Sequence, residues 1–390
     1  MTEAMKRPLR VAHVVGTAGA SGVESYLLAL LPSFDPAQVQ PTLFLPREGV
    51  LAGRMRARGV PVEYGAPTRK LAFGEIPALA RRWLGGFDLV HAHGPRATFW
   101  AMRAARRAHI SIVIASVHEL RWQTLEPGLK RELWIRLERQ ALRGASRLIT
   151  VSDATRSDLV ARWPDLAART STVYASAPLL LEADSLPRAR PGVGGETLRL
   201  VTVGRFNWQK GYDLLFPALA DLSKRGVAWT LDVVGSGELE AELRAQAASL
   251  GIAERVCWLG RDAELREVLA RAHAFVTATR AEMFGIAVLE AMAFGLPVLA
   301  PAVGSLPEVV ADGECGQLVP FDPESTLPAR LADVLARWAA DPAERVRLGA
   351  AGAARARREF SPAALAAGVT AVYRDAMVAA SDAGGGPLSS

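Results

Sequence analysis

The sequence predicts an α/β protein of two doubly wound domains, each built on a parallel sheet covered by helices. The chain has 390 residues, which is too many for one ordinary core of roughly 150 residues. Short apolar strand patterns alternate with helical patterns along its length. A stretch rich in Pro, Gly and charge at residues 185–196 interrupts the alternation, which then starts again. We therefore expect one domain over residues 1–185 and a second over residues 196–362.

The first domain begins with a strand, a glycine-rich turn and a helix. LRVAHVV at residues 9–15 reads as a buried strand, the turn covers residues 16–22, and VESYLLALL at residues 23–31 reads as a helix. Further buried strands are expected at residues 41–45, 88–92, 111–116 and 147–151.

The second domain repeats this plan after the linker. A strand at residues 198–203 and a helix at residues 212–224 open it, and further strands are expected at residues 230–234, 255–259, 273–277 and 297–300. Parallel strands of this kind are joined by right-handed crossovers. Their carboxyl ends would face a central cleft between the domains, because open α/β sheets bind ligands there.

Composition limits the class of protein. Half of the residues are hydrophobic, enough for a large core. The two cysteines, Cys257 and Cys315, form neither a disulfide framework nor a zinc site, so a reducing, cytoplasmic compartment is expected. The N-terminus lacks the apolar region of a signal peptide. No run of about 18 apolar residues is free of Gly, Pro and charge, so we expect no membrane span.

Charge is distributed unevenly along the chain. Residues 1–190 contain 27 Lys and Arg against 16 Asp and Glu, whereas the remainder contains 19 against 24. A basic first half attached to an acidic second half indicates that the first half meets an anionic partner. A membrane surface, a lipid-phosphate acceptor and nucleic acid all fit this charge.

The segment EMFGIAVLEAMAFGLPVLA at residues 282–300 contains two glutamates, Glu282 and Glu290. Phe284-Gly285 resembles a turn that opens a helix from Ile286, with Glu282 just before it. The first-turn N–H groups of a helix lack internal partners and can bind phosphate or sugar oxygens. Glu290 lies just over one turn further along, where a carboxylate could accept hydrogen bonds from both hydroxyls of a ribose. An ordinary amphipathic helix with two solvated glutamates has the same spacing.

A cationic loop, GRFNWQKG at residues 204–211, follows a strand and precedes a helix. Arg205 and Lys210 could converge on a diphosphate, the arginine as a fork and the lysine as a point charge. Two such cations would make a metal ion unnecessary for the departing nucleotide. We therefore expect no metal and no cofactor, although two solvated surface cations would give the same pattern.

The glycine turn and three histidines lie in the first half. Backbone N–H groups near Gly22 could approach a donor phosphate, or the turn could be only a tight turn. His118 follows a strand, where it could hydrogen-bond a sugar hydroxyl or the acceptor. His91 and His93 alternate along a strand end and are expected to face opposite sides of the sheet. Without a third ligand they are not expected to bind a metal, and His93 is expected on the acceptor side.

Together these segments resemble the retaining glycosyltransferases of family four, the group 1 glycosyltransferases, which have the GT-B fold. The resemblance covers almost the whole chain and is most specific over residues 201–316, in VGRFNWQKG, VVGSGE, WLGR, EMFGIAVLEAMAFGLPVLA and GSLPEVVADGECGQLV. SGVESYL, DLVHAH, SVHE and ITVSDATR are weaker marks in the first half. The resemblance implies a nucleotide-sugar donor, and a last helix over residues 363–380 that crosses back to the N-terminal domain.

The resemblance also implies a role for each matching residue. Arg205 and Lys210 would bind the diphosphate, Glu282 the transferred sugar and Glu290 the ribose. Backbone groups would also contact the donor. Those near Phe284, Gly285 and Ile286 would contact the sugar and phosphate, those near Gly22 the phosphate, and those near Arg261 the base. His118 would lie beside the reacting sugar carbon. The sequence departs from the family pattern at Tyr174-Ala175-Ser176-Ala177, at Thr279-Arg280-Ala281 and at Gly304-Ser305.

These features predict transfer of a sugar to a glycan or lipid-linked acceptor in polysaccharide or glycolipid biosynthesis. An epimerase or a phosphorylase of the same two-domain plan is the nearest alternative. A basic nucleic-acid-binding protein is a third reading, but the positive charge is not gathered in a recognisable nucleic-acid module. The segment RWQTLEPGLKRELWIRLERQALRGASR at residues 121–147 is read either as a solvated helix with core tryptophans or as a surface that docks on anionic lipid.

Overall fold

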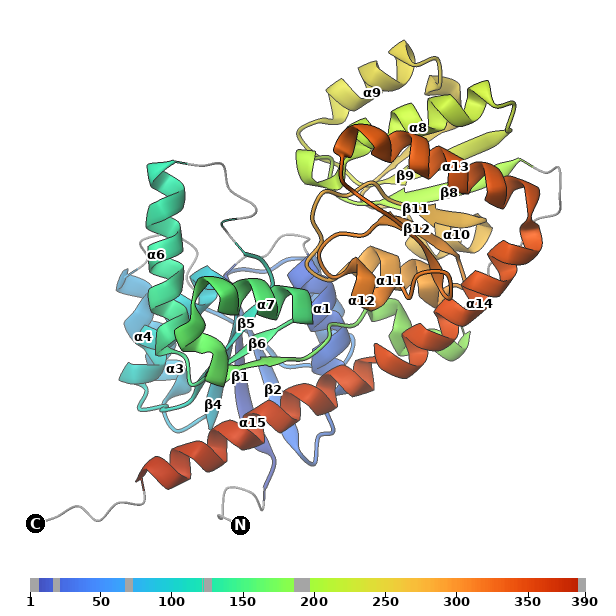
Figure 1. The fold of residues 1–390 in the computed structure, drawn as a ribbon. Helices are drawn as coiled ribbons and strands as arrows, with labels where there is room; N and C mark the ends of the chain where they lie inside the picture. The colour runs from blue at the N-terminus through green and yellow to red at the C-terminus, as the bar shows by residue number, and fades with distance from the viewer. Residues whose placement is uncertain are drawn as a thin grey trace, which may run out of the picture. The chain divides into compact units, whose positions relative to one another are not determined.

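The computed structural model describes residues 7–16, 22–66, 73–120, 122, 128–185 and 197–384. The chain divides into two compact units, one of Met1–Pro178 with Pro362–Ser390 and the other of Leu179–Ser361. Most of the glycine turn at residues 16–22 and most of the linker at residues 185–196 lie outside the described residues. Figure 1 shows the fold of both units.

The N-terminal unit contains a seven-stranded parallel sheet in the order β3-β2-β1-β4-β5-β6-β7. Its strands are β1 Leu9–Val15, β2 Val39–Leu45, β3 Val62–Tyr64, β4 Leu89–His93, β5 Val113–Val117, β6 Arg147–Thr150 and β7 Thr170–Thr172. The direction in which successive strands are added reverses between β1 and β4. The strands that follow β1 lie on one side of it, and those that follow β4 lie on the other side. Such a switch point opens a crevice at the carboxyl ends of the two strands.

Helices cover this sheet, namely α1 Gly22–Leu30, α2 Val50–Arg56, α3 Ile76–Trp83, α4 Pro95–Arg107, α6 Leu129–Gly144, α7 Asp153–Arg162 and α15 Pro362–Gly384. The helix α7 begins where the Ser152 hydroxyl accepts a hydrogen bond from the Thr155 N–H, which satisfies an otherwise unpaired first-turn donor. Buried side chains of β1, α3 and α4, including Trp83 and Trp100, form the core of this unit.

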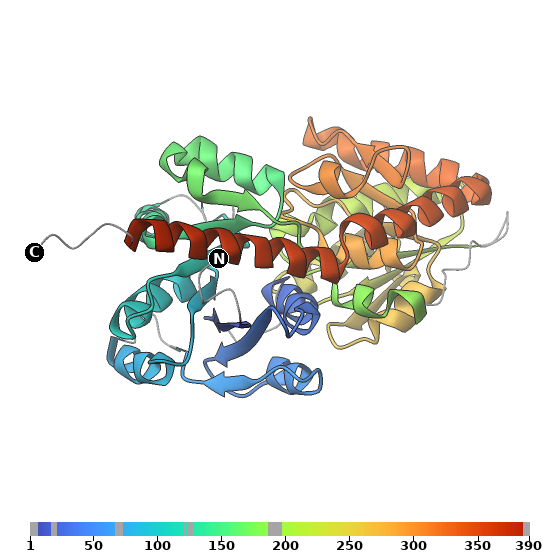
Figure 2. The ribbon, with the colours of Figure 1, turned by 90° about the horizontal axis from the view of Figure 1, so that it is seen from below.

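The last helix, α15, belongs to the N-terminal unit although it is most distant from it in sequence. It contacts α1 and β6 and runs beside both in the two views (Figures 1 and 2). Its residue Tyr373 is completely buried, and Arg374 donates a hydrogen bond to the Gln38 side chain at 2.8 Å. Packing of an apolar face, rather than local propensity, therefore holds this helix.

The C-terminal unit contains a six-stranded parallel sheet in the order β10-β9-β8-β11-β12-β13. Its strands are β8 Leu198–Val203, β9 Trp229–Val234, β10 Val256–Gly260, β11 Ala274–Val276, β12 Val298–Pro301 and β13 Gly316–Val319. Its helices are α8 Tyr212–Lys224, α9 Glu240–Ser249, α10 Leu265–Arg271, α11 Ile286–Ala293, α12 Leu306–Val309, α13 Leu327–Ala340 and α14 Pro342–Glu359. The switch point lies between β8 and β11.

These elements confirm the predicted fold class of two doubly wound parallel sheets. The helix expected at residues 212–224 has those bounds, and the helix expected to begin at Ile286 does so. The strands β3, β7 and β13, of three or four residues each, were missed.

One helical stretch among the described residues, Pro342–Asp382, has the length and composition of a membrane span. It comprises α14 and most of α15, each of which places buried side chains against its own unit. The sequence criterion of an uninterrupted apolar run did not single it out, because charged residues and glycines interrupt it.

Candidate functional site

Two loops meet at the switch point of the C-terminal sheet, where β8 and β11 end. The Lys210 ammonium contacts the Glu282 carboxylate at 2.6 Å, and both side chains are largely buried. The two loops are also joined by the Gln209 side-chain amide, which donates a hydrogen bond to the Ala281 carbonyl at 2.8 Å. The fold thus brings together the predicted lysine and the predicted first glutamate, which are 72 residues apart in sequence.

Backbone geometry explains why the first loop takes this course. The turn Trp208–Lys210 is capped by Asn207, whose side chain accepts from the Lys210 N–H, and it ends at Gly211 with φ +64°. A Cβ at Gly211 would lie 2.0 Å from the Ala278 carbonyl oxygen. Only glycine therefore permits both the left-handed conformation and the close approach of the two loops.

A second glycine sets the position of Glu282. Gly304 has φ +53°, and a Cβ there would lie 2.1 Å from the Glu282 carbonyl oxygen. The same carbonyl accepts a hydrogen bond from the Ser305 N–H at 3.0 Å. Of the Gly304-Ser305 pair, the position that requires glycine is thus the first, and the buried Ser305 holds the loop through its backbone.

Arg280, for which the sequence predicted no role, lies at the centre of this region. Its guanidinium forms ion pairs with Asp213 at 2.7 Å and Glu324 at 3.0 Å, and its side chain is 6% exposed. It also donates to the Trp208 carbonyl at 2.8 Å and lies over the Trp208 ring. The hydrogen bonds with Asp213 raise the pKa of Arg280 above its ordinary value. The signal in the sequence that could have identified Arg280 is its position, two residues before Glu282.

Glu290 lies in the second turn of α11 and is 9% exposed. Burial raises the pKa of its carboxyl from 4.5 to about 8, because a low-dielectric surrounding disfavours the charged form. The carboxyl is therefore mainly protonated at pH 7 in the ligand-free protein. Ahead of it, Phe284 and Gly285 are buried, Ile286 is half-buried and begins the helix, and Gly285 has φ +87°.

The remaining predicted donor residues are exposed. Arg205 lies just after β8, and Arg261 just after β10. Arg261 approaches Asp262 at 3.7 Å. Gly22 is the exposed first residue of α1 in the N-terminal unit.

Four of the five histidines of the N-terminal unit form one cluster at the centre of its sheet. His93 Nδ1 lies 3.2 Å from His118 Nε2, so the two predicted acceptor-side residues are neighbours. The expectation that His91 and His93 face opposite sides of the sheet was wrong, since their ring centroids are 4.3 Å apart. Residues two apart on a strand project from the same face.

A third buried histidine, His13, completes the cluster and was missed. It pairs with His91 across β1 and β4, and its Nδ1 lies 3.1 Å from His93 Nε2. Burial lowers the pKa of all three histidines well below 6.5, with smaller effects of the neighbouring rings. Burial likewise lowers the pKa of the half-buried His118 to about 3, so these imidazoles are neutral at physiological pH.

We tested whether this cluster suits a metal ion. Ligand atoms of His13, His91 and His93 lie within 4.8 Å of one another, so the fold supplies the third ligand that the sequence lacked. Both ring nitrogens of each histidine already take part in hydrogen bonds, to another ring, to Tyr373 or to Ser116. A cation would have to displace these hydrogen bonds.

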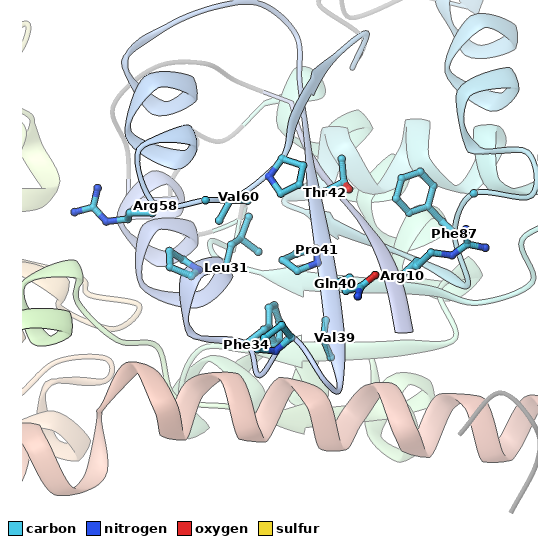
Figure 3. Close-up of a pocket in the computed structure, with 15 residues that line it drawn as sticks. Arg10, Leu31, Phe34, Val39, Gln40, Pro41, Thr42, Arg58, Val60 and Phe87 are labelled. Carbon is cyan, nitrogen blue, oxygen red and sulfur yellow. The ribbon is translucent and has the colours of Figure 1, made fainter. Parts of the chain in front are cut away.

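A pocket of about 550 Å³ lies at the opposite end of the N-terminal sheet (Figure 3). Its lining comes from the amino ends of β1 and β2 and from the segments that precede β3 and β4. Phe34 and Phe87 contribute apolar walls, and Arg10 and Arg58 lie at its edges (Figure 3). Because open α/β sheets bind ligands at the carboxyl ends of their strands, this pocket is separate from the candidate site.

Comparisons with known proteins agree with this architecture. A model of "Glycosyl transferases group 1" matches residues 188–355, and one of "Glycosyltransferase Family 4" matches residues 20–175. Phosphatidyl-myo-inositol mannosyltransferase of Mycobacterium tuberculosis is 30% identical over 355 residues, 89% of this chain and 88% of the relative. D-inositol 3-phosphate glycosyltransferase of Frankia alni is 31% identical over 403 residues, covering 93% and 96% of the two chains.

A solved structure supports the fold. Anabaena HepE in complex with UDP-glucose superposes with a TM-score of 0.77 at 19% sequence identity, covering 94% of this chain and 100% of that chain. This likeness confirms the predicted GT-B architecture of two Rossmann-like units.

Proposed function

Because this chain belongs to glycosyltransferase family four, the group 1 glycosyltransferases, we propose that it transfers a sugar from a nucleoside-diphosphate donor with retention of configuration and without a metal ion. The pairing of Lys210 with Glu282 at 2.6 Å, beside the start of α11, is the observation that carries the proposal. It supports the proposal because an ammonium able to bind phosphate and a carboxylate able to accept from sugar hydroxyls lie within one small volume. The acceptor would be a glycan or a lipid-linked molecule.

The proposed reaction is a front-face substitution at the anomeric carbon. The bond from this carbon to the leaving phosphate oxygen breaks, and its electron pair stays on the diphosphate. The acceptor hydroxyl oxygen forms the new bond from the same face, and its proton passes to the leaving phosphate oxygen. The protein's task is then to align the two substrates and to stabilise the diphosphate charge.

Each residue of the site has a task in this scheme. Lys210 and Arg205 would neutralise the departing diphosphate, and the first-turn N–H groups of α11 would add backbone donors. Glu282, fixed by Lys210, would accept hydrogen bonds from hydroxyls of the transferred sugar. Glu290 would hold the ribose. His118, neutral and half-buried, would hydrogen-bond a hydroxyl beside the reacting carbon.

The known relatives narrow the substrates to test. HepE was solved with UDP-glucose, so UDP-sugars are the first donors, followed by GDP- and ADP-sugars. The names of the two relatives specify a phosphatidyl-inositol lipid and an inositol phosphate. Both are anionic, and an anionic acceptor suits the excess of Lys and Arg in residues 1–190.

The central experiment measures turnover of each donor in EDTA and in Mg²⁺, with the anomeric configuration of the product assigned by NMR. Lys210→Ala should lower kcat by an amount equivalent to about 2–4 kcal/mol of transition-state stabilisation. Lys224→Ala, which truncates an exposed lysine of the same unit, is the matched control. Equal kcat in wild type and Lys210→Ala would refute the phosphate role. An inverted product, or turnover that requires Mg²⁺, would refute the corresponding part of the mechanism.

We also propose that the enzyme associates with the cytoplasmic face of a membrane through α6. Leu129 and Leu133 lie one turn apart on this helix and are 92% and 58% exposed, so they share one face. Arg136, on the same face one turn further, is exposed too. Apolar side chains next to cations suit an anionic bilayer surface.

Co-sedimentation with vesicles tests this surface. Wild type should bind vesicles that contain an anionic lipid more strongly than neutral ones, and Leu129→Ser with Leu133→Ser should weaken that binding. Val346→Ser, which alters an exposed apolar residue of the C-terminal unit, should have no effect. Binding that does not depend on anionic lipid, or that survives the double substitution, would contradict the proposal.

A further inference from the structure

We propose that a buried chain of hydrogen-bonded side chains behind His118 fixes which of its ring nitrogens carries the proton, and that Tyr373 of α15 is the positioning residue that sets this choice. The inference rests on the proposed function only in placing His118 beside the reacting sugar. The chain links six side chains of the N-terminal unit, namely His118, His93, His13, Tyr373, His91 and Ser116.

The outer half of the chain consists of histidines. His118 Nε2 lies 3.2 Å from His93 Nδ1, and His93 Nε2 lies 3.1 Å from His13 Nδ1. These side chains come from the carboxyl halves of three neighbouring strands, β1, β4 and β5, or from the residue that follows. His118 is the half-buried end of the chain, whereas the other two rings are buried.

The inner half passes through the last helix. His13 Nε2 lies 3.4 Å from the Tyr373 hydroxyl, which in turn lies 2.6 Å from His91 Nδ1. His91 Nε2 lies 2.8 Å from the Ser116 hydroxyl. Both nitrogens of each interior ring are therefore engaged.

A neutral imidazole has one N–H and one bare nitrogen, so each interior ring must donate once and accept once. Because burial keeps these rings neutral, the links from Tyr373 outward to His118 can be arranged in only two ways, which run in opposite directions. In one, His118 donates through Nε2 and keeps Nδ1 bare. In the other, His118 accepts at Nε2 and carries its proton on Nδ1.

The two contacts of Tyr373 select between these directions. A phenol is a better donor than acceptor, and O–H donors form shorter hydrogen bonds than N–H donors. The 2.6 Å contact is thus the one in which Tyr373 donates to His91, and the 3.4 Å contact is the one in which it accepts from His13. Followed outward, this direction makes His118 a donor to His93 through Nε2 and leaves Nδ1 bare.

A bare Nδ1 gives the enzyme a neutral acceptor for a substrate hydroxyl. The other tautomer would instead place an N–H donor at Nδ1. That donor would bind the oxygen of the acceptor hydroxyl that attacks, or of a sugar hydroxyl that binds Glu282. The hydrogen-bonded side chains therefore keep His118 in the neutral tautomer whose Nδ1 can accept a hydrogen bond from a substrate hydroxyl.

The test reads the tautomer directly. The protein has only six histidines. The His118 signals in two-bond ¹⁵N–¹H spectra of ¹⁵N-histidine-labelled protein can therefore be assigned by comparison with His118→Gln. Ligand-free wild type should show His118 with its proton on Nε2. Tyr373→Phe, which keeps the buried ring and removes only the hydroxyl, should populate the Nδ1–H form. Tyr64→Phe, which removes the hydroxyl of a half-buried tyrosine of the same unit that contacts Glu48 and Arg56, should leave the His118 signals unchanged.

Kinetics supply a second readout. Tyr373→Phe should lower kcat by roughly two- to tenfold, the fraction of the acceptor tautomer that is lost, with the KM for donor within about twofold of wild type. In a His118→Gln background the same substitution should cost nothing further, because the effect acts through His118. A loss that persists in that background would identify a merely structural role and overturn the inference.

Other outcomes also decide the question. A wild-type His118 protonated on Nδ1, or one unchanged by Tyr373→Phe, would overturn the inference. So would a stoichiometric metal ion in protein purified without chelator. The NMR measurement needs no substrate, so a wild type that binds no nucleotide sugar would count against the proposed function while leaving the tautomer result intact.

Discussion

Glu290→Gln should stabilise the ligand-free protein, and the gain should depend on pH. Glutamine keeps the shape of the side chain but cannot ionise. The folded carboxyl keeps its proton up to a pKa of about 8, whereas the unfolded carboxyl loses it above 4.5. Between these values the unfolded state alone gains free energy by ionising, so the wild type loses stability as the pH rises. Below pH 4.5 both states are protonated and the cost disappears.

The size of the effect follows from the two pKa values. One pH unit between them corresponds to about 1.4 kcal/mol, so the cost of Glu290 is about 3 kcal/mol at pH 7 and less than about 1 kcal/mol at pH 5. The buried amide of glutamine has its own desolvation cost, which makes about 3 kcal/mol an upper value. For a unit of this size the gain corresponds to a rise in Tm of up to about 6–12 °C at pH 7.

Thermal unfolding of wild type and Glu290→Gln at pH 5 and pH 7 would measure this difference. Glu242→Gln replaces an exposed glutamate of the same unit and should change Tm little at either pH, since surface substitutions fall within about 0.5 kcal/mol. A gain equal at both pH values, or a destabilised variant at pH 7, would refute the assignment of Glu290 as a buried neutral carboxyl.

Two further predictions concern the loops around Glu282. Gly304→Ala should lower Tm and abolish donor binding in calorimetry, because a Cβ there would meet the Glu282 carbonyl at 2.1 Å. Gly313→Ala, also at positive φ but with open space around it, should cost only about 1 kcal/mol, and equal effects of the two would disprove the steric argument. Arg280→Lys should lower kcat/KM by about tenfold or more, since lysine cannot bind two carboxylates and a carbonyl as a fork; steady-state kinetics unchanged from wild type would show that Arg280 does not position the lysine loop.

Several elements were predictable because their signals are local. Helices α8 and α11 each begin directly after a glycine, Gly211 or Gly285, at positive φ. A strand, a loop that ends in such a glycine and an apolar helix follow one another along the chain, so neighbouring residues are enough to identify them. The alternation of these patterns was enough to establish two doubly wound sheets.

The histidine cluster shows what local signals leave out. His13 reads as one polar residue in a buried strand, and only the parallel register of β1 with β4 places it opposite His91. Tyr373 joins the same cluster from a helix 282 residues beyond His91. No spacing rule connects positions so far apart.

Local sequence patterns were sufficient to predict the fold class, the two-domain plan, the family and the adjacency of a lysine loop and a glutamate loop to strand ends. These follow from local geometry, because strand periods, glycine turns and helix starts are set by neighbouring residues. The folded structure was needed to show that Arg280 binds the lysine loop, that Glu290 is buried and neutral, and that four histidines belong to one hydrogen-bonded network. Those properties depend on burial and on contacts between distant segments, since solvent exclusion and a partner's position, rather than residue type, decide protonation and orientation.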